Sequence, residues 1–118
     1  MKYLCLIYLE EEKLDAMPKS EFDALAREHL ALDEELQKSG HFIVAEALQS
    51  VQTATTVRVR NGRLSTTDGP FAETKEQLGG FFLINARDLN EAHQVASRMP
   101  SARIGSIEVR PIGDCTRR

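Results

Sequence analysis

The dipeptide Asn61-Gly62 lies near the middle of the chain and divides it into two similar halves. Apolar and polar side chains alternate over residues 55–60 before it, and a second short polar and apolar stretch, 63–67, follows it directly. Both central residues of the tightest hairpin turn need a positive φ, which Asn and Gly adopt at the least cost. The sequence therefore predicts a β-hairpin over residues 55–67 with one polar face.

Each half of the chain outside this hairpin contains a short apolar run, an amphipathic stretch and a second apolar run. The expected strands cover residues 2–9, 41–48, 79–86 and 104–110, the expected helices cover residues 20–38 and 88–99, and residues 10–19 are expected to form a polar loop. The order is β-α-β, hairpin, β-α-β, which is typical of the α+β ferredoxin-like fold, a split βαβ sandwich. The hairpin is then an insertion between the two halves of one domain.

The helix boundaries follow from capping patterns. Ser20 with Asp23 and Asp88 with Glu91 have the spacing of a capping box, so both helices are expected to begin there. Gly40 is suited to the left-handed conformation that ends a helix. We therefore expect a first helix that ends at Ser39-Gly40 and a second helix that ends at about Met99.

The bulk properties describe one ordinary globular domain. The chain has 118 residues, 42% of them apolar, and a net charge of −3. Residues 1–50 carry 5 basic and 11 acidic side chains, a net charge of −6, and residues 51–118 carry 10 basic and 7 acidic, a net charge of +3. This distribution argues against a nucleic-acid partner. No segment has the length of a membrane span or the form of a targeting peptide, and a cytoplasmic location is expected.

The two cysteines, Cys5 and Cys115, have no partner at metal-ligand spacing, and no disulfide is expected. Cys5 is expected in the core and Cys115 at the surface, in a flexible tail over 112–118. A ferredoxin-like sheet has helices on one face only. A second copy is therefore expected to cover the other face and form a homodimer.

His29 is the first candidate for chemistry. It lies on the apolar stripe of the first helix, formed by Phe22, Leu25, His29, Leu32 and Leu36. One interpretation is a half-buried histidine with a single hydrogen bond, and the other is a titratable group at the edge of a cleft. His41 and His93 are expected at the surface, and the three histidines are too dispersed to suggest a metal site.

The hairpin and the loop after it supply the other candidates. Arg58 and Arg60 either keep one hairpin face soluble or form an anion site. Asp68 fits a turn with Gly69 and Pro70. That turn does not explain the charged residues of 71–76, which follow without helical or strand periodicity. The sequence contains no nucleophile elbow, phosphate loop or cofactor fingerprint, and no cofactor is expected.

The stretch "TDGPFAETKEQLGGFFLI", with the opening "MKYLCLIY", the hairpin "TATTVRVRNGRL" and the closing "SIEVRPI", resembles the bacterial YCII-related family in its DGPF-domain branch. The resemblance covers nearly the whole chain. It implies a ferredoxin-like fold and dimers in the manner of dimeric α/β barrels. It also implies an active site with a His and an Asp. His29 in "REHL" matches the His, but Met99 in "SRMP" stands where the family has the Asp.

Three functions stay open. The first is a homodimeric small-molecule binding or sensing protein. The second is a small lyase, isomerase or monooxygenase-like enzyme, in which His29 moves the proton and Asp68 is a conceivable substitute acid. The third, implied by the resemblance, is an interaction partner of an extracytoplasmic-function sigma factor. The residues expected at the site are His29, Arg58, Asp68, Phe71, Glu73 and Lys75.

Overall fold

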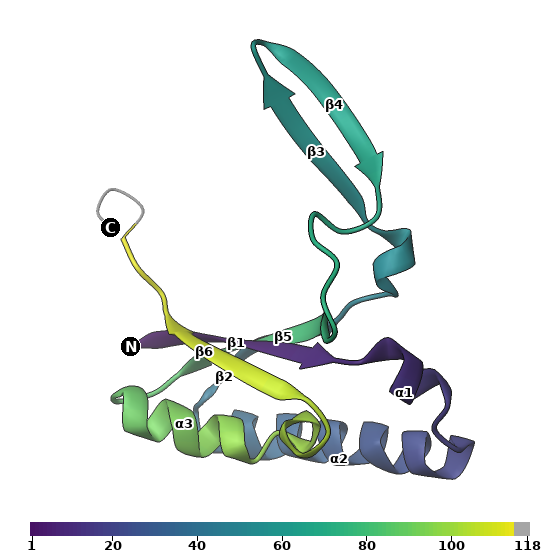
Figure 1. Cartoon of the computed structure of the whole chain (residues 1–118). Helices are drawn as coiled ribbons and strands as arrows, with labels where there is room; N and C mark the ends of the chain where they lie inside the picture. Colours follow the sequence, from purple (N-terminus) through teal and green to yellow (C-terminus); the bar gives the residue numbers. More distant parts are fainter. Residues whose placement is uncertain (115–118) are drawn as a thin grey trace.

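The computed structural model describes residues 1–114, and its strands and long helices follow the predicted order (Figure 1). Four strands form one antiparallel sheet in the order β2-β5-β1-β6. The strands are β1 (Lys2–Leu9), β2 (Phe42–Ala47), β3 (Thr55–Arg60), β4 (Arg63–Asp68), β5 (Gln77–Asn85) and β6 (Ser106–Pro111). The helices are α1 (Glu11–Asp15), α2 (Lys19–Lys38) and α3 (Leu89–Ser97), with 3₁₀ turns η1 (Val51–Thr53) and η2 (Pro100–Arg103). This is the ferredoxin-like arrangement, so the predicted fold class is confirmed.

The core lies between the sheet and the layer formed by α2 and α3, which cover the same face (Figure 1). Because successive strand side chains point to opposite faces, Tyr3, Cys5 and Ile7 of β1 are buried against the helices. Leu32 and Leu36 of α2 meet them from the helix layer. Burial raises the pKa of the Cys5 thiol to about 11, so this cysteine is an inert core residue, as predicted.

The opposite face of the sheet carries no helix. On it Leu4 lies opposite Leu83, and Leu6 lies opposite Phe81, in the register of β1 and β5. All four side chains remain partly exposed. A continuous apolar strip therefore runs across the centre of the helix-free face.

The predicted start of the first helix is wrong. α2 begins at Lys19, one residue before Ser20, and its N-cap position is Pro18, whose side chain makes no capping hydrogen bond. Proline suits this place because its φ is already near the helical value and because an N–H there would have no helical partner. Asp23 instead forms an ion pair with Lys19, with 2.9 Å between Oδ2 and Nζ.

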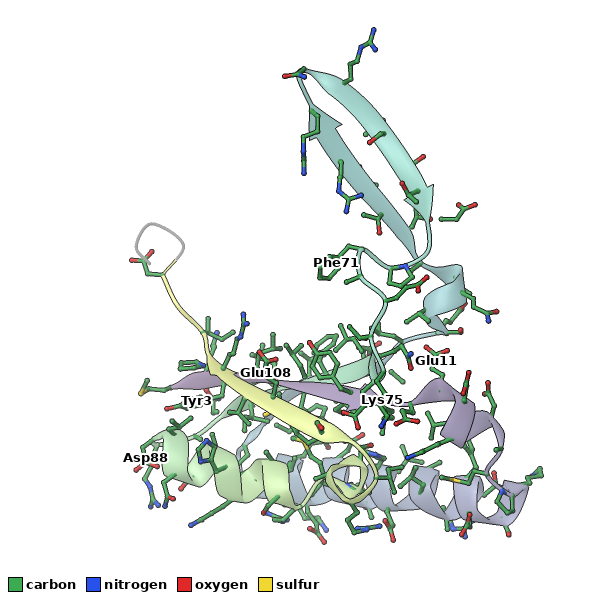
Figure 2. The ribbon with its side chains drawn as sticks, viewed as in Figure 1. Tyr3, Glu11, Phe71, Lys75, Asp88 and Glu108 are labelled. Carbon is green, nitrogen blue, oxygen red and sulfur yellow. The ribbon has the colours of Figure 1, made fainter. Side chains whose placement is uncertain are left out.

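The predicted polar loop over residues 10–19 contains the short helix α1, which the sequence pattern did not indicate. Contacts with distant residues hold it in place. The Glu11 carboxylate accepts hydrogen bonds from the Ser50 hydroxyl at 2.6 Å and from the Val51 N–H at 2.9 Å (Figure 2). The Glu11 N–H donates to Gln77 Oε1 at 3.0 Å. A helix fixed by such contacts carries no local periodicity by which it could be recognised.

The hairpin of β3 and β4 is confirmed, with φ of 54° at Asn61 and 74° at Gly62. It forms a separate two-stranded sheet, and we call its residues 55–68 the arm. Figure 1 shows the arm standing away from the four-stranded sheet, on the side opposite the helices. Within the predicted tail, the Ile112 N–H still donates to the Lys2 carbonyl at 2.9 Å. The rest of that tail, residues 115–118 with Cys115, lies outside the described residues.

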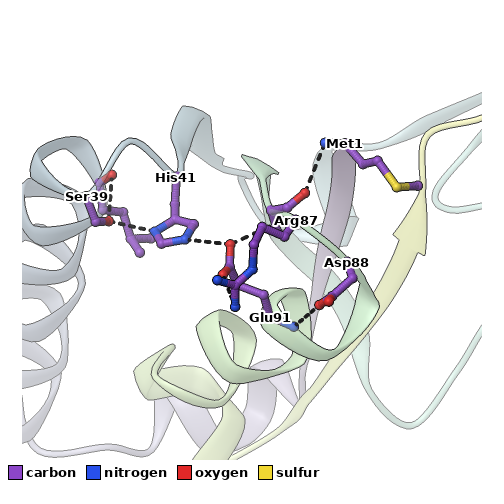
Figure 3. A network of polar contacts seen from close by, with 8 residues as sticks. Met1, Ser39, His41, Arg87, Asp88 and Glu91 are labelled. Atoms are coloured by element: carbon purple, nitrogen blue, oxygen red, sulfur yellow. Dashed lines mark hydrogen bonds and ion pairs between the residues drawn. The ribbon is translucent and has the colours of Figure 1, made fainter.

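His41 is less exposed than predicted. Its Nδ1 lies 2.7 Å from the Ser39 hydroxyl, and its Nε2 lies 3.1 Å from Glu91 Oε1 (Figure 3). Glu91 also accepts the Arg87 N–H and pairs with the Arg87 guanidinium. The Arg87 N–H bond, followed by the His41 contact, lowers the pKa of Glu91. The network ties the starts of β2 and α3 together and gives His41 a structural role. His93 is exposed, as predicted.

Asp88 caps α3 as predicted, because its Oδ1 accepts the Glu91 N–H at 2.9 Å. We expect Asp88→Ala to lower the free energy of unfolding by about 1 kcal/mol, the usual effect of losing such a cap. Ser20→Ala is the matched control, since Ser20 lies inside α2 and caps nothing, and its effect should stay within about 0.5 kcal/mol. Urea denaturation measures both. Equal effects of the two substitutions would contradict the assignment of the caps.

Candidate functional site

A cavity of about 490 Å³ lies between the first half of α2 and the sheet. Its volume is in the range of small-molecule sites. Most of the lining is apolar, and it includes Leu9, Phe22, Leu25, Leu30, Ala45 and Phe82. The polar residues of the lining are His29, Asp33, Glu46 and Ser101.

Two features of the sequence leave this space open. The apolar stripe of α2 is buried at Leu32 and Leu36, but Phe22, nearer the start of the helix, is 48% exposed. Across from it, β5 passes with Gly79 and Gly80, which carry no side chains into the cavity. A Cβ on Gly80 would lie 2.8 Å from the Glu46 carbonyl oxygen, so the closeness of β2 requires glycine there.

His29 is half-buried at the inner end of the cavity. Its Nε2 lies 2.8 Å from the Ser101 hydroxyl, which η2 carries from the far side of the core. Its ring is stacked with that of Phe82, with centroids 6.3 Å apart and an angle of 26° between the planes. One hydrogen bond and one ring contact therefore fix the imidazole. His29 is half-buried and also lines a cavity, so the two interpretations of this residue do not exclude each other.

Desolvation by burial lowers the pKa of His29 below its ordinary value of 6.5, and the positive charge of Arg103 acts in the same direction. Asp33 and Glu28 act against this shift, since their negative charges favour the imidazolium. The lowering prevails, so the imidazole is neutral at neutral pH. A neutral imidazole has one nitrogen that can accept a proton, which is the state that a general base needs.

Asp33 lies one helical turn after His29 and faces the same cavity. Its Oδ1 atom is buried and has no hydrogen-bond partner among the described residues. Burial raises the pKa of this carboxyl, although the charge of His29 opposes the shift. Buried polar atoms are nearly always paired, so this unpaired carboxylate oxygen beside the cavity is an uncommon feature.

Ser101 orients His29 and is not itself placed to react. Ser101 is 2% exposed, and its hydroxyl is already paired with His29 Nε2. Met99, at the position of the family's Asp, is fully buried in the core. The structure therefore has a carboxylate near His29 after all, but it comes from α2 at Asp33 and not from the segment before Pro100.

The candidates from the arm and its loop lie elsewhere. Arg58 pairs with Ser65 along the arm, and Asp68 lies opposite Thr55 at its base. Phe71 is 81% exposed. None of Arg58, Asp68, Phe71, Glu73 and Lys75 lines the cavity at His29. The structure thus does not bring these side chains together with His29 within one chain.

The charged loop after the arm makes mainly structural contacts. Lys75 Nζ lies 3.8 Å from Glu10 Oε1, and Glu76 Oε1 accepts a hydrogen bond from the Ser106 hydroxyl at 2.7 Å. Glu73 lines a second, smaller cavity of about 360 Å³ at the base of the arm, together with Val51 and Gln77. Within residues 1–114, Glu73 and Lys75 do not pair with each other.

Sequence reasoning missed Asp33 and Ser101. Asp33 carried a signal, because it lies four residues after His29 and shares its helical face. Ser101 carried none, since 72 residues separate it from His29 and only the folded chain brings them together. Among the described residues no group of His, Cys, Asp and Glu side chains could hold a metal ion. No described helix is long and apolar enough to cross a membrane.

The fold and the cavity together define a ferredoxin-like α+β protein with a small-molecule-sized site at His29. Residues 1–116 match the YCII-related domain, and the chain belongs to this family. An uncharacterised protein from Rhizobium meliloti (strain 1021) is 37% identical over 114 residues, which cover 95% of this chain and 92% of that protein.

Among solved structures, the chain is similar to 5-chloro-2-hydroxyhydroquinone dehydrochlorinase (TftG) from Burkholderia phenoliruptrix AC1100 in complex with 2,5-dihydroxybenzoquinone. The TM-score is 0.55 at 18% identity, and the match covers 96% of this chain and 94% of TftG. At this identity the likeness concerns the fold, and it agrees with the resemblance found in the sequence.

Proposed function

We propose that this protein binds a small, mainly apolar molecule in the cavity at His29, and that His29 transfers a proton to or from that molecule. One observation carries the proposal. The neutral imidazole of His29 and the carboxyl group of Asp33 line a cavity whose walls are mostly apolar. Polar groups of this kind inside apolar walls orient a ligand and exchange protons with it.

The lining indicates the chemistry of the ligand. Leu25, Ala45 and Phe82 favour an apolar or aromatic body. The carboxyl group of Asp33, a residue of the cavity lining, favours a ligand that carries a hydrogen-bond donor such as a hydroxyl group. A hydroxylated six-membered ring meets both requirements. TftG is named for such a molecule and was solved with another, which supports this choice of ligand class.

The reaction that these groups support is a proton shift. The neutral imidazole of His29 accepts a proton from a hydroxyl or an activated carbon of the ligand, and the imidazolium returns it to another atom. Return to a different position isomerises the molecule, and return to a leaving group completes an elimination. Ser101 holds the ring in place during both steps.

The acting species in this proposal is a homodimer. The apolar strip of Leu4, Leu6, Phe81 and Leu83 on the helix-free face supports it, because sheets with one open apolar face are commonly covered by a second copy.

Titration with 2,5-dihydroxybenzoquinone tests the site. We expect saturable binding by calorimetry, and stabilisation of about 2.7 kcal/mol at a ligand concentration of 100 Kd. Ala26→Phe should weaken binding at least about tenfold, because Ala26 lines the cavity and is exposed enough to accept a larger side chain without unfolding. Ala31→Phe is the matched control on α2, since Ala31 is also exposed but lies outside the cavity.

The outcomes separate the parts of the proposal. Absence of saturable binding, for this probe and for simple catechols and hydroquinones, would overturn the assignment of the cavity. Binding without any change in the absorption spectrum of the bound quinone over time would leave a binding or sensing protein and remove the proton transfer. Equal loss of binding in Ala26→Phe and Ala31→Phe would place the ligand elsewhere.

A further inference from the structure

The contacts within a single chain do not explain how the arm is stabilised. β3 and β4 pair with each other, and in the described part of the chain no other strand joins their sheet. Its base is held by the Gly69 N–H, which donates to the Ala54 carbonyl at 2.7 Å, and by the Thr56 hydroxyl, which donates to the Gly69 carbonyl at 2.9 Å. An isolated two-stranded hairpin is marginally stable at best in water. Something else must therefore cover it.

The two faces of the arm differ sharply. In the register of β3 and β4, Val59 lies directly opposite Leu64, and Val57 shares their face. These side chains are 58%, 69% and 59% exposed in the single chain. Arg58, and the pair of Arg60 and Arg63, occupy the other face. The arm thus offers an apolar face and a basic face to whatever lies beside it.

The chain exposes more surface than a compact domain of its length, and the excess is as large as the area buried in a stable dimer interface. The radius of gyration is 16.2 Å, against about 13.5 Å for a compact domain of this length. The accessible surface is 8611 Å², roughly 2,200 Å² more than a compact chain of this mass exposes. Each partner of an intimate dimer buries about 1,000–2,500 Å². A second copy could therefore restore the ordinary burial of this chain.

We propose that the arm clasps a second copy of this chain, with its apolar face packed against that copy. The arm rises on the side of the helix-free sheet face, so the arm and that face lie on the same side of the molecule (Figure 1). Phe71, at the base of the arm, projects over that side (Figure 2). The inference rests on the homodimer of the proposed function and adds to it a second contact region outside the sheet.

The reach of the arm and its charge support this occupant. Six residues per strand extend about 20 Å, whereas two sheets packed face to face are about 10 Å apart. The arm therefore extends past the second copy's sheet to its helix layer. There α2 carries six acidic and three basic residues, a net charge of −3, and the arm carries three arginines and Asp68, a net charge of +2. The net charges of the arm and of α2 are opposite, which favours the approach of a second copy.

The test is the dimer dissociation constant, measured by sedimentation at low micromolar to 100 µM protein. We expect the unaltered chain to be a dimer, and Val59→Thr with Leu64→Thr to raise the constant at least tenfold. Both positions are exposed in the single chain, and threonine keeps the strand propensity, so circular dichroism should be unchanged. Arg58→Glu should raise the constant as well and remove most of its dependence on salt, because the net charge of the arm falls from +2 to 0. Leu89→Thr is the control, because Leu89 is 44% exposed at the start of α3, outside the arm and outside α2.

Each result supports or overturns the clasp by the arm. Dimers of unaltered strength in the double threonine variant would overturn the clasp and leave a dimer that uses the sheet face alone. A monomer at 100 µM would overturn both the clasp and the homodimer, and would point to a different protein as the occupant of the arm. Binding of the quinone probe to the cavity is measured independently, so that part of the proposed function stands or falls by itself.

Discussion

Replacement of Gly105 by alanine is expected to lower the free energy of unfolding by about 3 kcal/mol or more, the upper end for a clash in a packed region. Gly105 precedes β6 at the point where this strand meets the end of β1. A Cβ there would overlap the carbonyl oxygen of Tyr8 and would lie 2.8 Å from Leu9 Cδ2. The Tyr8 oxygen belongs to the backbone of a central strand, so it cannot move aside as a flexible side chain could. The change should lower the melting temperature by roughly 10 °C or more.

Gly113→Ala is the matched control for this prediction. Gly113 follows β6, and a Cβ at that position would meet nothing within 4 Å. Its replacement should change stability by less than about 0.5 kcal/mol. Thermal and urea denaturation measure the stability of both variants. They compare Gly105, which the nearby β1 backbone requires, with Gly113, which has no close neighbour. A Gly105→Ala variant as stable as the unaltered chain would show that β1 and β6 are further apart than the structure has them.

The fold could be predicted because its main determinants are local. Asn61-Gly62 specifies the hairpin turn, and Asp88 specifies the start of α3, within four or five residues of sequence. The prediction failed where distant residues decide. α1 depends on contacts of Glu11 with Ser50 and Val51, which lie 39 and 40 residues away. No short window of sequence contains such information.

The same distinction explains the candidate site. His29 was recognisable because one polar residue interrupts an apolar helical stripe. Its partner Ser101 comes from η2 through tertiary packing, and the cavity wall across from α2 includes Gly79 and Gly80 of β5. A sequence pattern shows which side chains share an element, but it does not show which side chains two elements bring together.

The charged stretch after Pro70 gains a physical account from its contacts. Lys75 reaches Glu10, Glu76 reaches Ser106, and Gln77 reaches Glu11, so the stretch joins the arm to the ends of β1 and β6. These contacts hold the base of the arm at a fixed place beside the sheet. If the arm clasps a second copy, a precise position of its base is what the dimer requires, and the charged residues supply it without entering the cavity.

Replacement of His29 by glutamine is expected to lower the rate of any proton transfer in the cavity by about 10²–10⁴-fold, the usual contribution of a general acid or base. Glutamine can keep a hydrogen bond to Ser101, so binding of the quinone probe should change far less than turnover. His93→Gln is the matched control, because His93 is exposed on α3. Unchanged turnover in His29→Gln would remove His29 from the reaction while leaving the cavity as a binding site.

The same substitution has a signature in the pH dependence of stability. The folded-state pKa of His29 lies below 6.5, so between these two values the unfolded chain binds a proton that the folded chain does not. Stability therefore falls as the pH drops through 6.5 towards the folded-state pKa, and His29→Gln should lose this part of the slope. In Asp33→Asn the pKa of His29 should fall further, since the carboxylate that favours the imidazolium is gone. Histidine NMR titrations and urea denaturation between pH 5 and 8 measure both effects, and a His29 pKa above 6.5 would contradict the neutral imidazole on which the proposed proton transfer depends.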